Sequence, residues 1–131
     1  MQEASQRESE KPHRKLIVWE KGMELVQTIY ALTNSFPVSE RFSLVSQMRR
    51  SSISIPSNIA ERAARFSNKE KLNFFHIARG SLSELDTQIE ISFRLQYMSQ
   101  EQQRILQNLI DDVGRLLHGL ILSRKERTLY V

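Results

Sequence analysis

Arginine is concentrated in one polar stretch of the chain, QMRRSSISIPSNIAERAARF, which spans residues 47–66. A planar guanidinium group can form two parallel hydrogen bonds to a phosphate, and serine or asparagine can add bonds to other phosphate oxygens. This stretch therefore favours phosphate contact with little reading of bases. We assign to a candidate nucleic-acid surface the residues Arg49, Arg50, Arg62, Arg65 and Lys69, with a second basic patch of Arg124, Lys125 and Arg127.

The same stretch also fits a solvated helix face, in which Glu61 and Arg65 form an i,i+4 ion pair. The formal net charge of +4 and the pI near 9.7 favour polyanionic partners only weakly, because many proteins with a similar excess bind no nucleic acid. At the level of the sequence both interpretations stay open.

Other constellations that could carry chemistry are absent from the sequence. Di-iron sites in helix bundles use Glu-x-x-His pairs on their helices, but neither His76 nor His118 lies three residues after a glutamate, and His13, which does follow Glu10 at this spacing, lies in the polar N-terminal segment. The chain has no G-x-S-x-G and no glycine-rich phosphate loop. We therefore expect no catalytic residues, no metal, no cofactor and no enzymatic activity.

The composition is that of a single soluble domain. The chain has 131 residues, enough for one hydrophobic core, and 40% of them are hydrophobic. It has no cysteine, so disulfides and thiolate metal sites are excluded. No apolar run reaches the length of a membrane span, and the N-terminus lacks the apolar core of a signal peptide. We expect a cytoplasmic protein that does not associate with a membrane.

Four helical patterns must position the basic residues. The first runs from about Leu16 to Phe36, before Pro37, and Ser39 could cap the next. The second is expected to kink at Pro56, and its apolar seam consists of Val45, Met48, Ser52, Ile55, Ile59, Ala63 and Phe66. Capping-box spacings at Ser67/Glu70 and Ser99/Gln102 start the third and fourth helices.

These patterns predict an all-α fold, an up-down-up-down antiparallel four-helix bundle. The expected organisation is a disordered polar tail over residues 1–15, a bundle domain over 16–125 and a C-terminal tail over 126–131. In the third helix, Gly80 is expected at a close helix crossing, and Arg79 beside a carboxylate such as Glu61 or Glu84.

The first and fourth helices each carry two adjacent apolar stripes. Either a wide core or a second, subunit-facing surface would account for them. In the first helix the stripes are Val18, Leu25, Ile29, Leu32 and Phe36, and Trp19, Met23, Val26 and Tyr30. In the fourth they are Ile105, Leu109, Val113, Leu116 and Leu120, with Leu106, Ile110, Leu117 and Ile121 alongside.

Several segments together resemble a known family. They are VWEK at the first helix, the FP turn, QMRR with SIPSNIAE in the second helix, and IARGS in the third. From Leu16 to roughly Arg124 the chain is similar to the 23S rRNA-intervening-sequence proteins. The resemblance implies a four-helix bundle commonly assembled as a ring-shaped homopentamer. It also implies relatives that are accessory proteins of diversity-generating retroelements and bind a reverse transcriptase and its RNA.

The chain departs from this family after Glu61. The family usually has a glycine at the next position and another two residues on, where this chain has Arg62 and Ala64. We therefore predict a non-enzymatic, homo-oligomeric bundle, a pentamer by this resemblance, that associates with RNA or DNA. The alternative is a protein-interaction scaffold that docks a partner such as a reverse transcriptase.

Overall fold

The structure, a computed structural model, describes the backbone of residues 16–129 and the side chains of residues 16–124. This part of the chain contains four α-helices, one short 3-10 helix and no strand. The elements are α2 (Ile17–Thr33), η2 (Val38–Glu40), α3 (Leu44–Arg62), α4 (Asn68–Arg94) and α5 (Gln100–Leu129). The all-α prediction is confirmed, while the tail predicted over residues 1–15 lies outside the described part.

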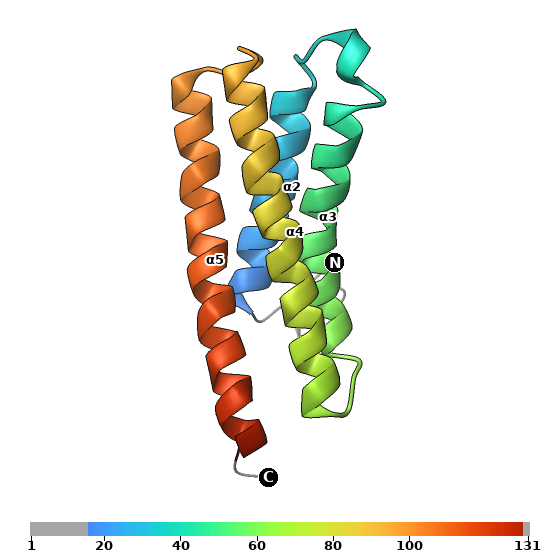
Figure 1. Cartoon of the computed structure of the whole chain (residues 1–131), viewed down its shortest axis with the longest axis vertical. Coiled ribbons are helices and arrows are strands. Elements are labelled where there is room, and N and C mark those ends of the chain that lie inside the picture. Colours follow the sequence, from blue (N-terminus) through green and yellow to red (C-terminus); the bar gives the residue numbers. More distant parts are fainter. Residues whose placement is uncertain (1–15, 130–131) are drawn as a thin grey trace, which may run out of the picture.

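The four helices form a bundle in which each packs against the next and α2 also packs against α5. The connections from α2 to α3 and from α4 to α5 lie at one end, the upper end in Figure 1. We call this the α2–α3 end. The turn between α3 and α4, the start of α2 and the C-terminal part of α5 lie at the opposite end, which we call the α3–α4 end.

The core follows the predicted seam of α3 from Val45 to Ile59 and differs from the prediction in α5. Met48, Ile55, Ile59, Phe75 and Leu85 are fully buried. In α5 the buried residues are Leu106, Ile110, Val113, Leu117 and Ile121, whereas Ile105 is 46% exposed. Apart from Val113, the first of the two predicted stripes, which begins at Ile105, therefore lies at the edge of the core. The second stripe, which begins at Leu106, fills the core because it packs against α2 and α4.

The connection between α2 and α3 corrects the predicted helix ends. α2 ends at Thr33, and Phe36 lies in the following turn, where it is buried with its ring centroid 5.4 Å from that of Tyr97. Ser39 does not cap α3. It lies inside η2, and α3 begins only at Leu44, whose backbone N–H donates to the Glu40 carboxylate at 3.4 Å.

The serines of α3 satisfy their hydrogen bonds largely within the helix. The hydroxyls of Ser51 and Ser52, both buried, donate to the carbonyls of Gln47 and Arg49 at 2.9 Å. Asn58 Nδ2 donates to the Ser54 carbonyl at 2.7 Å, close to Pro56. Such bonds allow a polar helix to pack against a core without leaving its hydroxyl groups unsatisfied.

The end of α3 corrects the predicted seam. Residues 63–65 form i→i−3 backbone hydrogen bonds, which tighten the chain after Arg62. Since such a turn has about three residues instead of 3.6, it rotates later residues away from the core face. Phe66, expected in the seam, is 99% exposed. Ser67 then caps α4 by accepting a hydrogen bond from the Glu70 backbone N–H at 3.1 Å.

The cap of α5 agrees with its prediction in full. The Ser99 hydroxyl accepts from the Gln102 backbone N–H at 3.1 Å, and the Gln102 side chain accepts from the Ser99 backbone N–H at 2.9 Å. These reciprocal bonds form a capping box, which fixes where the last helix begins.

The expectations for Gly80 and Arg79 are wrong. A Cβ atom at Gly80 would meet nothing within 4 Å, so no helix crosses closely there. Arg79 is exposed and interacts with His76 Nδ1 at 3.0 Å instead of a carboxylate. The glycines that face another helix are Gly22, where a Cβ atom would lie 3.5 Å from the Pro56 ring, and Gly114, where it would lie 3.5 Å from the Leu82 side chain.

Candidate nucleic-acid interface

The arginines that the sequence groups together lie in two separate places. Arg49 and Arg50 lie in the first part of α3, whereas Arg62 is its last residue. At 1.5 Å per residue the two groups are about 20 Å apart along the helix axis. α3 therefore does not present one continuous stripe of free guanidinium groups.

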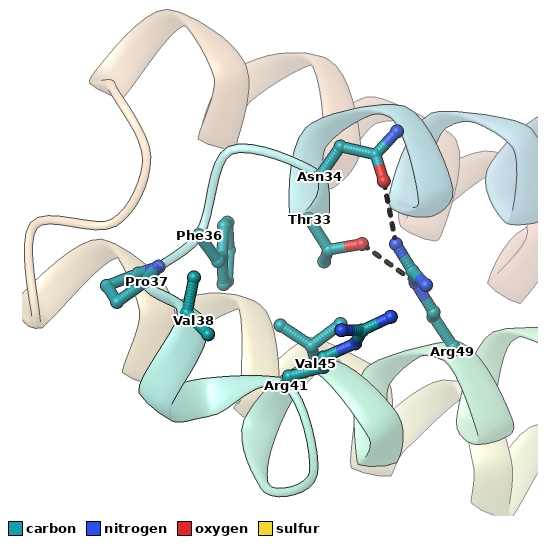
Figure 2. A pocket seen from close by; sticks show the side chains of 8 residues that line it. All are labelled: Thr33, Asn34, Phe36, Pro37, Val38, Arg41, Val45 and Arg49. Atoms are coloured by element: carbon teal, nitrogen blue, oxygen red, sulfur yellow. Dashed lines mark hydrogen bonds between the residues drawn. The ribbon is translucent and has the colours of Figure 1, made fainter.

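Arg49 is committed to a structural role at the α2–α3 end. Its Nε donates to Thr33 Oγ1 and one terminal nitrogen donates to Asn34 Oδ1, both at 3.1 Å. Figure 2 shows the side chain reaching from α3 to the end of α2, across a recess of about 260 Å³ that Arg41 also lines. The guanidinium carbon also lies 4.5 Å from the ring centroid of Tyr30. Three contacts with α2 therefore hold this arginine in place.

Arg50 lies on another face of the bundle. It is exposed and lines a recess of about 300 Å³ between α3 and α4, together with Glu84. At the floor of this region the hydroxyls of Ser54 and Ser81 are 2.7 Å apart. The nearby carboxylate makes this recess less favourable for a phosphate.

Arg62 is the most unusual of the predicted residues. Only 9% of its surface is exposed, and its Nε has no hydrogen-bond partner. Its guanidinium carbon lies 5.3 Å from the ring centroid of Phe75, which is fully buried. Burial lowers the pKa of the Arg62 guanidinium, and the positive charge of Arg124 lowers this pKa further. Arg62 nevertheless stays protonated, because an arginine pKa begins so far above neutral.

Arg124 brings the two predicted patches together at the α3–α4 end. One of its terminal nitrogens donates to Asn68 Oδ1 at 3.3 Å, and the Asn68 side chain donates to the Arg124 carbonyl at 2.8 Å. These bonds tie the C-terminal part of α5 to the first turn of α4. The side chains of Lys125 and Arg127, the other members of the second patch, lie outside the described residues.

Arg65 and Lys69 lie on the same end of the bundle, around the α3–α4 turn. Arg65 forms an exposed ion pair with Glu61 at 3.1 Å, so this feature of the solvated-face interpretation is present. Its guanidinium carbon also lies 4.9 Å from the Phe74 ring centroid. Both residues line a recess of about 540 Å³ with Ser67, Glu70, Asn73 and Phe74. Between residues 61 and 71 the chain has four basic and two acidic residues, so this end is basic.

The site contains residues that the sequence analysis missed. Asn68 was not singled out, although it links Arg124 to α4. Phe66 was assigned to the core and Phe74 was not discussed. A signal was present for Phe66, because it directly precedes the predicted cap residue Ser67 and so lies in the turn between two helices, where the seam of the second helix need not continue.

The described residues offer no other obvious chemistry. Among residues 16–124, no group of three or more histidine, aspartate or glutamate side chains could hold a metal ion. Within the same part of the chain, no helix is both long and apolar enough to cross a membrane.

A solved structure with a similar fold supports the four-helix arrangement. A solved structure from Bacteroides thetaiotaomicron, of a protein with unknown function from the S23 ribosomal protein family, is 26% identical in sequence. The two structures align with a TM-score of 0.74 over 80% of this chain and 95% of the other. No curated protein matches the chain. The family model for the 23S rRNA-intervening sequence protein matches residues 14–119, so the chain belongs to this family.

Proposed function

We propose that the chain is a non-enzymatic cytoplasmic protein that binds the phosphate backbone of RNA or DNA through the α3–α4 end of the bundle. The observation that carries this proposal is Arg62. Its side chain is nine-tenths buried, its Nε–H has no acceptor, and the positive charge of Arg124 lowers its pKa further.

A phosphate would resolve both of these unfavourable features. A buried donor without an acceptor costs about 1–3 kcal/mol, and more when it is charged. An anion near Arg62 and Arg124 would supply acceptors for charge-assisted hydrogen bonds and offset the repulsion between the two cations. Lys69, two residues into α4, adds a further positive charge at the same end.

We also propose that the up-down-up-down bundle assembles as a ring-shaped homopentamer. The second stripe of α2 supports this part of the proposal, because Trp19, Met23 and Val26 remain only half-buried. With Ile53 and Pro56 of α3 they line an apolar recess of about 340 Å³. In a ring the basic ends of five subunits would add their fields at one rim, which increases the attraction of a polyanion.

The experiment is a salt series of binding to a structured RNA. We expect the wild type to show a steep slope of log affinity against log salt, and the triple variant Arg62→Gln, Arg65→Gln, Lys69→Gln to flatten this slope by about 2, at roughly 0.7–0.9 per lost phosphate contact. The matched control is Arg50→Gln, Arg94→Gln, Arg104→Gln, which removes the same charge from exposed arginines elsewhere. Equal losses in both triple variants, or no salt-dependent binding at all, would contradict the proposal.

The second candidate function is a scaffold that docks a protein such as the reverse transcriptase of a diversity-generating retroelement. The apolar recess between α2 and α3 favours it, provided that ring assembly leaves this recess open. Sedimentation of Ile53→Asp without any partner shows whether the ring uses this recess. If it does, the substitution should reduce the sedimentation mass of the oligomer. If the mass is unchanged while capture of the purified enzyme is lost, the scaffold is the better assignment.

A further inference from the structure

The turn between α3 and α4 displays an aromatic side chain to solvent. Phe66 is 99% exposed and lies between Arg65 and Ser67. Single exposed aromatic residues are common, so exposure alone identifies no surface. Phe42, at the α2–α3 end, is 91% exposed and has the guanidinium carbon of Arg41 5.8 Å from its ring centroid. The two phenylalanines differ mainly in what surrounds them.

The recess next to Phe66 is lined by both planar and polar side chains. Arg65 and Ser67, the two sequence neighbours of Phe66, both line this recess of about 540 Å³. A second aromatic ring, Phe74, forms part of its wall, with the Arg65 guanidinium over it at 4.9 Å. Aromatic rings and guanidinium planes are the groups on which unpaired nucleobases stack.

Glu70 shows that this recess is not simply a second phosphate site. Its carboxylate lines the recess and would repel a phosphate held there. A carboxylate instead accepts hydrogen bonds from the exocyclic amino group of a base such as cytosine, and Asn73 can both donate and accept. The recess is therefore suited to the edge and face of a base, while Arg62, Lys69 and Arg124 supply positive charge for the backbone.

We propose that the α3–α4 end binds an unpaired segment of nucleic acid, with one base stacked on Phe66 and a neighbouring base in the recess of Phe74 and Glu70. This inference rests on the proposed function and adds the structural class of the ligand. A duplex keeps its base faces stacked inside and presents mainly phosphates and sugars to a protein. It would use the cations of this end and leave Phe66 without a role.

The test compares a single-stranded RNA of about 12 mixed nucleotides with a duplex of the same length, at one salt concentration. We expect the wild type to bind the single strand more tightly. Phe66→Ala should weaken single-strand binding by about 5- to 100-fold, since one aromatic–base stack is lost, and should leave duplex binding and the salt slope unchanged. Phe42→Ala, the matched control, should bind both ligands like the wild type.

The outcomes separate the two levels of the proposal. If neither RNA binds in a salt-dependent way, the proposed function itself fails. If both RNAs bind equally and Phe66→Ala has no effect, the phosphate-binding function stands and the inference about unpaired bases is wrong. If Phe66→Ala lowers the sedimentation mass, Phe66 is covered by a second copy of the chain, which also overturns the inference. The melting temperature of Phe66→Ala should equal that of the wild type, because the Phe66 side chain is exposed to solvent.

Discussion

At the α2–α3 end, Arg49 donates to Thr33 and Asn34 and lies over the Tyr30 ring, so its guanidinium group contacts α2 and the cap residue that follows α2. At the α3–α4 end, Arg62 is more deeply buried, yet its Nε has no acceptor and its pKa is lowered by burial and by Arg124. The two side chains belong to one helix and one residue type. Their difference shows that the number of available acceptors, and not burial, separates a structural arginine from a candidate anion site.

Both ends of the bundle also contain arginines that pair with a carboxylate. Around the α2–α3 end, Arg94 pairs with Glu90 at 3.0 Å and Arg104 with Glu101 at 2.6 Å. Around the α3–α4 end, Arg65 pairs with Glu61 at 3.1 Å, whereas Arg62 forms no ion pair among the described residues. Arg62 therefore differs from these three paired arginines in lacking a carboxylate partner among the described residues.

Arg49→Met should show the largest effect on stability. It removes two charge-assisted hydrogen bonds between α2 and α3 while it keeps most of the side-chain volume, so we expect a loss of about 2 kcal/mol in the free energy of unfolding. Urea unfolding followed by circular dichroism measures this loss. A change of less than about 0.5 kcal/mol would mean that Arg49 is no more structural than an ordinary surface arginine.

Arg62→Met should act in the opposite direction. The variant removes a buried charge without an acceptor, and the gain exceeds the lost contact with the Phe75 ring, so stability should rise by about 1 kcal/mol. Nucleic-acid binding should fall in the same variant. A clear loss of stability would show that Arg62 is satisfied in the folded protein and would remove the contrast with Arg49.

The smallest effect concerns Tyr97, whose hydroxyl donates to the Glu40 carboxylate at 3.2 Å at the α2–α3 end. Partial loss of hydration raises the pKa of Tyr97, and the charge and hydrogen bond of Glu40 raise it further. Because the folded pKa exceeds the unfolded value of about 10, this bond contributes stability below pH 10 that is lost as the pH rises through the folded pKa.

The measurement is the difference in melting temperature between the wild type and Tyr97→Phe from pH 8 to pH 11. The phenylalanine keeps the ring beside Phe36, so the wild type should be slightly more stable at pH 8, and the difference should decrease as the pH rises above 10. A difference that is independent of pH would show that the Tyr97 hydroxyl does not titrate against Glu40.

Helix number and type could be predicted from the sequence because the apolar positions recur at helical spacing over long segments. The ends of the helices could be predicted less accurately. The spacing of Ile59, Ala63 and Phe66 continues through the turn, and only the backbone reveals that the helix tightens after Arg62. In α5 two neighbouring stripes are similarly apolar, and which of them is buried depends on how α2 and α4 pack against the helix.

The candidate site could be predicted only as a list of basic residues. The sequence places Arg49 and Arg50 beside each other and gives no sign that Arg49 is satisfied by Thr33, which is 16 residues away. Arg62 and Arg124 were assigned to separate patches, because their proximity depends on how α3, α4 and α5 pack. A list of charged residues cannot show which of them already have acceptors in the folded protein.

The hydrogen bonds between Asn68 and Arg124 join two segments that lie 56 residues apart in the chain. Arg62 approaches this pair from a third helix, so the cluster exists only while α3, α4 and α5 are docked together. An anion that binds the cluster would act as a reversible crosslink between these helices. By mass action, an anion at 100 times its dissociation constant adds about 2.7 kcal/mol to the free energy of unfolding. Binding of such an anion and the docking of the last turns of α5 would therefore be thermodynamically linked, so that each could be measured through the other.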